Sequence, residues 1–196
     1  MMIDTLADVL RARPSGFSLV EFVVMVALLA LVATMALPNV APMAQTRVDA
    51  AAAEIAQALR FAQQEAIRTG AARVASLDPV SSRVRVFQLD MSTGSPVEDV
   101  SKPVFYPLIR QQNYDLALLT LPATRSVRIH SALFTFAGGS TATQLAFDAT
   151  GAPVNILGPN PTDAKPLSTG EVDVELGNAH RAIFVDALTG RVTLSS

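Results

Sequence analysis

Residues that commonly carry catalysis or bind metals are scarce in this sequence. Cysteine and tryptophan are absent, and the only histidines are His130 and His180. Without cysteine, disulfides, thiolate metal sites and a cysteine nucleophile are excluded. The two histidines lie far apart in the chain and lack the spacing of paired metal ligands. We therefore interpret each of them as a surface or turn residue.

Sequence motifs of the common catalytic sites are also missing. There is no G-x-S-x-G, no phosphate-binding G-x-x-x-x-G-K-[ST] loop, no G-x-G-x-x-G and no H-E-x-x-H. Residues 148–151, DATG, could be mistaken for a calcium loop, but they lack the further carboxylates that six to eight oxygen ligands require. The sequence predicts a protein that is not an enzyme and uses no cofactor, metal or small-molecule substrate. A membrane-anchored periplasmic enzyme would need a deep pocket with a perturbed histidine or carboxylate.

One acidic residue, Glu21, lies at the edge of a long apolar segment. It is the only charged residue from 17 to 37. At about 1.5 Å per residue this segment spans about 31 Å, close to the hydrocarbon thickness of a bilayer, and only a helix satisfies its own backbone there. Arg11 and Arg13 precede it and predict a single-pass protein with a cytoplasmic N-terminus. A carboxylate at such a site is a functional candidate, and its simpler interpretation is a side chain that snorkels to the interface.

Three simpler interpretations compete for the apolar segment: a cleaved signal peptide, an ordinary signal anchor and a buried core helix. A signal peptide has an apolar core of about 7–15 residues and a small-x-small cleavage site. Here the run is longer, and TMA at 34–36 is the nearest approach to such a site. A buried core helix fits poorly with a stretch this long and this apolar. Glu21, at the edge of the segment, is the residue that distinguishes among these interpretations.

Residues 16–21, GFSLVE, resemble the type IV prepilin processing motif. In that family a membrane peptidase cuts after the glycine and methylates the new amino-terminus. The resemblance implies cleavage between Gly16 and Phe17 and N-methylation of Phe17. It also implies that Glu21 pairs with the terminal amine of a neighbouring subunit, which would offset the cost of burying the carboxylate in a fibre core.

The resemblance and the proline positions predict four segments. Pro38 and Pro42 are expected to kink the helix that begins in the membrane. The segments are a leader peptide at 1–16, a transmembrane and fibre-core helix at 17–37, a periplasmic amphipathic helix at 38–70 and a head domain at 71–196.

Beyond the prolines, apolar residues recur at spacings of four and three, which predicts a helix with one buried face and a C-cap at Gly70. The buried stripe consists of Val48, Ala52, Ile55, Leu59, Ala62 and Ala66. Residues 58–68 are similar to the segment L-x-x-A-R-x-x-A-I-x-R of the GspH/FimT family of minor pilins and pseudopilins. Gln63 stands near the usual arginine of that segment, so the match is partial.

The head contains short β-branched and aromatic runs separated by Gly, Pro, Ser and Asp, which predicts antiparallel strands. We expect strands at 72–77, 83–89, 114–119, 126–130, 133–137, 144–148, 172–176, 182–185 and 191–194. Residues 99–109 and 157–169 are expected loops, and 148–151 and 188–191 expected turns. The latter turn and the strand after it resemble the closing hairpin of the family. The expected fold class is α+β, with a long N-terminal helix packed on a C-terminal antiparallel β-sandwich head.

The resemblance implies a minor pseudopilin of the H class, a structural subunit of the type II secretion pseudopilus that serves protein export across the outer membrane. Its expected partners are other pseudopilins or pilins, the prepilin peptidase and the inner-membrane assembly platform. Its expected location is the bacterial inner membrane, with the head in the periplasm, and then the periplasmic fibre.

The alternative is a FimT-like minor type IV pilin that serves pilus biogenesis or captures DNA, which calls for exposed arginines and lysines. The net charge of −2 and the lack of a dense arginine cluster favour the secretion role. A DNA-binding patch would have to form from scattered positions: Arg125, Arg128, Arg181 and Arg191.

Overall fold

The computed structural model describes residues 18–36, 41–90, 92, 95–107, 109, 111–156, 158 and 163–195. These residues belong to two units, 1–39 and 40–196. The buried core residues of the described chain all lie between Val48 and Val192, so the second unit contains a core of its own.

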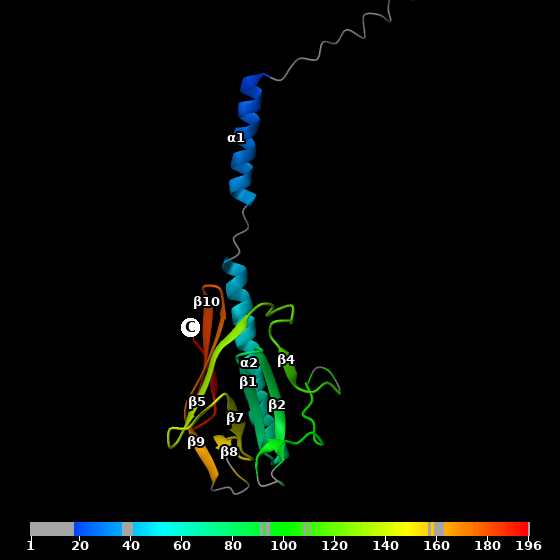
Figure 1. Ribbon diagram of the computed structural model, residues 1–196, viewed down its shortest axis with the longest axis vertical. Helices are drawn as coiled ribbons and strands as arrows, with labels where there is room; N and C mark the ends of the chain where they lie inside the picture. Colours follow the sequence, from blue (N-terminus) through cyan, green and yellow to red (C-terminus); the bar gives the residue numbers. More distant parts are fainter. Residues whose placement is uncertain are drawn as a thin grey trace, which may run out of the picture. The chain divides into compact units, whose positions relative to one another are not determined.

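Helix α1, Leu19–Ala36, is the element of the first unit (Figure 1). Its sequence contains neither proline nor glycine, and its β-branched and straight-chain apolar residues all permit a helix. The helix lies within the predicted segment 17–37. The leader at 1–16, Phe17 and Pro38 lie outside the described residues.

Helix α2, Ala41–Thr69, begins the second unit. Pro42 occupies its first turn, where a backbone N–H would have no partner within the helix, so proline is tolerated there. Gly70 follows with a φ of +65°, the left-handed conformation of a helix C-cap, as the sequence predicted. Residues 37–40 lie outside the described residues, so the kink near Pro38 and Pro42 stays a prediction.

One face of α2 is buried against the sheet, where it packs on strands that include β1, β9, β10 and β11. The six residues of the predicted stripe, from Val48 to Ala66, are all fully buried, which confirms the periodicity. Four of the six are small alanine or valine side chains, and small side chains let a helix backbone lie close to a sheet.

The remaining elements of the second unit are strands (Figure 1). They are β1 Arg73–Asp78, β2 Arg83–Asp90, β3 Val97–Glu98, β4 Asp115–Ala117, β5 Arg128–Phe136, β6 Thr141–Ala142, β7 Gln144–Phe147, β8 Pro153–Ile156, β9 Ala164–Leu176, β10 Ala179–Val185 and β11 Val192–Leu194. Every pairing among these strands is antiparallel. The predicted α+β fold, a helix packed on an antiparallel β head, is confirmed.

The strands form one hydrogen-bonded network with the path β11-β10-β9-β8-β7-β1-β2-β3, while β4 pairs with β2 and β5 pairs with β9 and β6. The long β9 joins two parts of this network. Its first residues, 164–166, pair with β8, and its remainder pairs with β5 and β10. Strand β9 therefore connects the two parts of the sheet.

Two expectations about the strands were wrong. Residues 126–130 and 133–137 were expected as separate strands, but β5 is continuous from 128 to 136, with a register shift between Ile129 and Ser131 where it pairs with β9. A bulge lets one strand continue through such an irregularity. Residues 164–169 were expected in a loop, but they form the start of β9 because β8 and β5 supply their hydrogen-bond partners. The short strands β3, β6 and β8 were not predicted.

The main core lies between α2 and the sheet, and its largest fully buried side chains include Tyr114, Phe134, Phe136 and Phe147. A second, smaller cluster lies on strands β1, β2, β7 and β8. It consists of Val74, Phe87, Ala146 and Val154. Because Val74 is paired with both Phe87 and Ala146, this cluster occupies one row across the strands.

Candidate functional site

The first turn of α1 carries Glu21, the residue on which the fibre hypothesis depends. The backbone N–H of Phe22 donates to the carbonyl oxygen of Ser18 at 3.1 Å, and the N–H of Val20 lies 3.4 Å from the Ser18 hydroxyl oxygen. Ser18 therefore occupies the position of a helix cap. Glu21 is exposed, and an acidic side chain in the first turn is favoured by the positive end of the helix dipole. Gly16 and Phe17, the predicted cleavage and methylation residues, lie outside the described residues.

The large apolar side chains of α1 from Leu19 to Val32 are exposed on every side of the helix. Their exposed fractions range from 48% at Val26 to 79% at Leu19. No helix in the described parts of the chain is both long enough and apolar enough to meet the criteria for a membrane span. The described residues of the first unit leave this apolar surface exposed, whereas apolar area of this extent is normally covered.

Helix α2 is attached to the C-terminal strands by two arginines. Arg181 on β10 donates from Nε to the Asp49 carboxylate at 2.8 Å, and its Nη2 lies 2.6 Å from the same oxygen, Oδ1. Its Nη1 donates to the carbonyl oxygen of Ser195 at 2.9 Å. Arg60 on α2 donates to the carbonyl oxygen of Val192 at 2.9 Å. Both arginines thus join the helix to the end of the chain.

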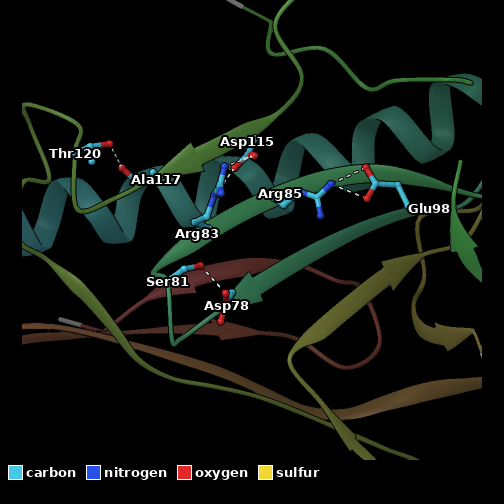
Figure 2. A network of polar contacts seen from close by, with 8 residues as sticks. All are labelled: Asp78, Ser81, Arg83, Arg85, Glu98, Asp115, Ala117 and Thr120. Carbon is cyan, nitrogen blue, oxygen red and sulfur yellow. Dashed lines mark hydrogen bonds and ion pairs between the residues drawn. The ribbon is translucent and has the colours of Figure 1, made fainter. Parts of the chain in front are cut away.

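A polar cleft of about 480 Å³ lies on the outer side of β1, β2 and β4. Figure 2 shows how its charged side chains face one another. Arg83 binds Asp115 through two hydrogen bonds of 3.1 and 2.6 Å, and Nη2 of Arg85 lies 2.6 Å from both carboxylate oxygens of Glu98. Each guanidinium therefore has its own carboxylate, which leaves little net charge with which to recognise a ligand.

The turn at the edge of this cleft is held by Asp78. Its carboxylate accepts hydrogen bonds from the Ser81 hydroxyl (Figure 2) and from the Val80 N–H at 2.9 Å. These bonds stabilise the charged form, with the Ser81 hydroxyl contributing most, and they lower the pKa of Asp78 below its ordinary value. Such bonding is typical of a structural turn.

The two histidines lie on strands and are exposed, on β5 for His130 and on β10 for His180. Nδ1 of His130 lies 3.2 Å from the Glu175 carboxylate. Within the described residues no three His, Cys, Asp or Glu side chains gather as metal ligands would. The interpretation of both histidines as surface residues is confirmed by their exposure.

Two of the arginines considered for a DNA-binding patch lie on opposite faces of the sheet. Arg128 is paired with Glu175, whereas Arg181 is paired with Val174, the next residue of β9. Paired residues share a face and successive residues alternate, so Arg128 and Arg181 project oppositely. Arg181 is also bound to Asp49. In the described structure, Arg128 and Arg181 therefore do not form one basic patch.

A family model described as type II transport protein GspH matches residues 51–189 of this chain. The chain belongs to the GspH family. The resemblance drawn from residues 58–68 is thereby confirmed, and the match extends through the β head as far as the turn at 186–190. GspH proteins are structural pseudopilins of type II secretion, so the expected general role, a pseudopilin that associates with other pseudopilins, holds for this chain.

Two solved structures of the minor pseudopilin EpsH from the type 2 secretion system of Vibrio cholerae are similar to this GspH-family chain. One has 14% sequence identity and a TM-score of 0.46, and it covers 76% of this chain and 97% of its own. The other has 13% identity and a TM-score of 0.47, with coverages of 78% and 97%. No curated protein matches this chain significantly.

Sequence reasoning missed two residues with notable polar environments, Gln63 on α2 and Arg73 on β1. Gln63 was noted only as a departure from the usual arginine of the GspH segment. In the structure its Nε2 donates to two backbone carbonyl oxygens, that of Gly151 at 2.9 Å and that of Thr189 at 2.8 Å. Arg73 was not singled out, yet it is the most buried arginine among the described residues. The departure at Gln63 was the available signal; for Arg73 the sequence offered none.

Proposed function

We propose that this chain is a minor pseudopilin of a type II secretion system, a structural subunit of the pseudopilus that serves protein export across the outer membrane. The observation that carries the proposal is the GspH match over residues 51–189. In the sequence this region follows an apolar segment that starts with a prepilin-like motif at 16–21. The two features together are those of an anchored subunit with a periplasmic head.

The apolar segment at 17–37 is proposed as the membrane-spanning and fibre-core helix. This proposal rests on the whole segment of the sequence, which extends beyond the described bounds of α1. The exposed apolar side chains of α1 require a partner, because about 25 cal/mol is lost for each Å² of apolar surface left in water. Lipid would supply that partner before assembly and the helices of neighbouring subunits after it. The N-terminus would lie in the cytoplasm and the head in the periplasm.

Glu21 is proposed as the assembly residue. After cleavage between Gly16 and Phe17, the new terminal amine would be the opposite charge available to a carboxylate surrounded by apolar helices. An unpaired carboxylate in such surroundings is costly, whereas a paired one sets the axial position of each subunit. The prepilin peptidase, the other pseudopilins and the inner-membrane assembly platform are the partners that this scheme requires.

Mass spectrometry of the mature protein tests the processing step. We expect a chain that begins at Phe17 with one added methyl group. A native chain that retains residues 1–16, or one trimmed near Ala36, would rule out the fibre role.

Complementation of secretion tests the role of Glu21. In a strain that lacks this subunit, Glu21→Ala should reduce export of a type II substrate and incorporation into the pseudopilus. Glu171→Ala removes an exposed acid of β9 on the head; it serves as a matched control and should leave both unchanged. Equal behaviour of the two variants would contradict the proposal. Salt-dependent binding of DNA by residues 40–196 would instead favour the pilin alternative.

A further inference from the structure

A pocket of about 360 Å³ lies on the head beside the C-terminal end of α2. Three cations line it: Arg68, Arg73 and Lys102. Glu65 is the only carboxylate among its described lining residues. Aromatic and proline side chains, including Phe61 and Phe105, form much of the remaining wall. The pocket therefore combines positive charge with an apolar surface.

Arg73 is the cation that this arrangement leaves unsatisfied. Only 5% of the residue is exposed. Its Nη1 donates to the carbonyl oxygens of Ala72 and Ala71 at 3.2 and 3.4 Å, and its Nε has no hydrogen-bond partner among the described residues. No described carboxylate lies within ion-pair distance of it. A buried charge without an opposite charge is costly, and arginine cannot lose its proton to avoid that cost.

The nearby acids are already engaged with other cations. Glu65 binds Arg68 through both oxygens, with distances of 2.9 and 2.6 Å. Asp99 lies 3.8 Å from the ammonium group of Lys102. Burial is the largest influence on the pKa of the Arg73 guanidinium, and it lowers that pKa. The Coulombic attraction of Glu65 raises the pKa, but its effect is smaller. The charge that would complete the pocket must therefore come from outside the described chain.

Strand β3 and the loop after it, which supplies part of the pocket wall, also expose large apolar residues. Val97, Val100, Phe105 and Ile109 are between 45% and 86% exposed, and Phe105 itself lines the pocket. An exposed aromatic side chain in the wall of a charged pocket is typical of protein-binding surfaces, where a polar anchor sits among apolar contacts.

We propose that this pocket binds the carboxylate of an aspartate or glutamate on an apolar segment of a partner protein. The planar guanidinium of Arg73 lines the pocket without an ion-pair partner among the described residues, and guanidinium groups pair well with carboxylates. The apolar wall favours a side chain on a peptide over a free inorganic anion. The inference rests on the proposed function in one respect: a fibre subunit needs a site on its head at which a neighbour docks.

The test uses the full-length, isotope-labelled chain in phospholipid nanodiscs and the blocked peptide acetyl-Val-Glu-Val-amide. We expect saturable shifts of the Arg73 Nε–Hε signal and of the backbone amides of Ala72 and Gln88. The matched peptide acetyl-Val-Gln-Val-amide should cause no saturable shift. Saturation by sodium phosphate alone, equal effects of both peptides, or no response to the glutamate peptide would each overturn the proposal and leave Arg73 as a structural cap of the preceding carbonyls.

Variants at the pocket sharpen the test. Lys102→Gln should weaken binding of the glutamate peptide about threefold to fivefold, the range for a single exposed charge. Arg73→Gln should abolish it. Arg83→Gln removes a cation of the separate polar cleft and should bind as the unchanged protein does. If Arg73→Gln fails to fold, Lys102→Gln still tests the proposal, because Lys102 is exposed and its replacement should not affect folding. An unchanged affinity of Lys102→Gln for the glutamate peptide would contradict the proposal.

This assay and the test of the proposed function fail separately. Peptide binding requires neither processing nor secretion, so a chain that keeps residues 1–16 could still bind the peptide. Conversely, a correctly processed and secretion-active subunit could show no binding, and only the docking site would then be lost.

Discussion

Nε2 of Gln63 lies 2.9 Å from the carbonyl oxygen of Gly151, and the same nitrogen donates to Thr189 at 2.8 Å. Gly151 belongs to the turn after β7, and Thr189 belongs to the turn after β10. One side-chain amide of α2 thereby holds two turns that lie far from each other in the chain. Both turns have an aspartate at their start and a glycine at their end, in the sequences DATG and DALTG.

Replacement of Gln63 by alanine should destabilise the head. Two hydrogen bonds to backbone carbonyls are lost at a partly buried site, so we expect a loss of about 1–2 kcal/mol in the free energy of unfolding. Urea denaturation of residues 40–196, followed by circular dichroism, measures it. The control is Gln64→Ala, at the adjacent exposed position, which should change the free energy by no more than about 0.5 kcal/mol. Equal losses of unfolding free energy in the two variants would show that the two hydrogen bonds of Gln63 contribute nothing to the stability of the head.

Two glycines with similar backbones should respond differently to substitution by alanine. Gly190 has a φ of +68° and Gly177 a φ of +62°, so a side chain is strained at both. At Gly190 an added Cβ would also lie 2.6 Å from Nε2 of Gln63 and 3.0 Å from Phe147, whereas at Gly177 nothing lies within 4 Å. We expect Gly177→Ala to cost about 1 kcal/mol and Gly190→Ala about 2–4 kcal/mol. If urea denaturation shows similar losses of unfolding free energy for the two variants, then α2, which carries Gln63, moves away from the added methyl group without cost.

The turn at 186–190 should lose stability in acid. Oδ1 of Asp186 accepts from the Thr189 hydroxyl at 2.7 Å and from the N–H groups of Thr189 and Leu188 at 2.8 and 3.2 Å. These bonds, with the Thr189 hydroxyl first, lower the pKa of Asp186 below its ordinary value of 3.8. A lowered pKa contributes stability that is present above pH 3.8 and is lost as the pH falls through the folded value.

Carboxyl chemical shifts from an NMR titration give the pKa of Asp186 directly. Thr189→Val removes the hydroxyl donor and should move that pKa up, toward its ordinary value. Thr193→Val removes a hydroxyl that does not bind Asp186 and should leave the pKa where it was. A pKa that does not move in Thr189→Val would assign the shift to the backbone N–H groups instead.

Helix α2 was predictable because its periodicity is local. Alternation of apolar residues at spacings of three and four places Val48 through Ala66 on one face whatever they pack against, and Gly70 ends the helix by its own conformational freedom. The alternation at the start of β2 is equally local, since Arg83 is exposed while Val84 and Val86 are buried. Fold class follows from such elements, since one long helix and many short strands bury their apolar faces in few ways.

The start of β9 could not be predicted by the same reasoning. Residues 164–169 include a proline and lie just before Gly170, a composition typical of loops. Their strand conformation depends on partners elsewhere: Pro166 is paired with Val154 of β8, and its carbonyl oxygen accepts from the N–H of Ala137. Long-range pairing therefore overrides local preference here.

The sites on the head depend on the same kind of long-range contact. Gln63 meets its two acceptors across 88 and 126 residues of sequence. Arg73 opens a strand, where a cation is ordinarily exposed, and it is buried at the base of a pocket that α2 and the loop at 102–107 also line. By contrast, the processing motif at 16–21 is a local pattern, so the sequence alone predicts it.

The two tyrosines of the chain should resist ionisation while the head is folded. Tyr114 is buried and stacks on Phe61 with ring centroids 5.0 Å apart, and Tyr106 meets its edge at 5.1 Å. Burial is the main cause that raises the pKa of Tyr114 well above 10, with smaller contributions from Tyr106 and Glu54, and burial also raises the pKa of Tyr106.

Because the neutral form is held in the folded state, the resulting stability is complete below pH 10 and declines as the pH rises above the unfolded value. Absorbance at about 295 nm reports both groups cleanly, since tyrosinate absorbs there and the chain contains no tryptophan. Folded residues 40–196 should show little tyrosinate at pH 10, whereas the chain unfolded in guanidinium should be about half ionised. In the Tyr106→Phe variant, Tyr114 is the single tyrosine and should ionise in one transition, at a higher pH than in the unfolded chain. A folded protein that titrates near pH 10 at both tyrosines would contradict the packing of Tyr114 between Phe61 and Tyr106.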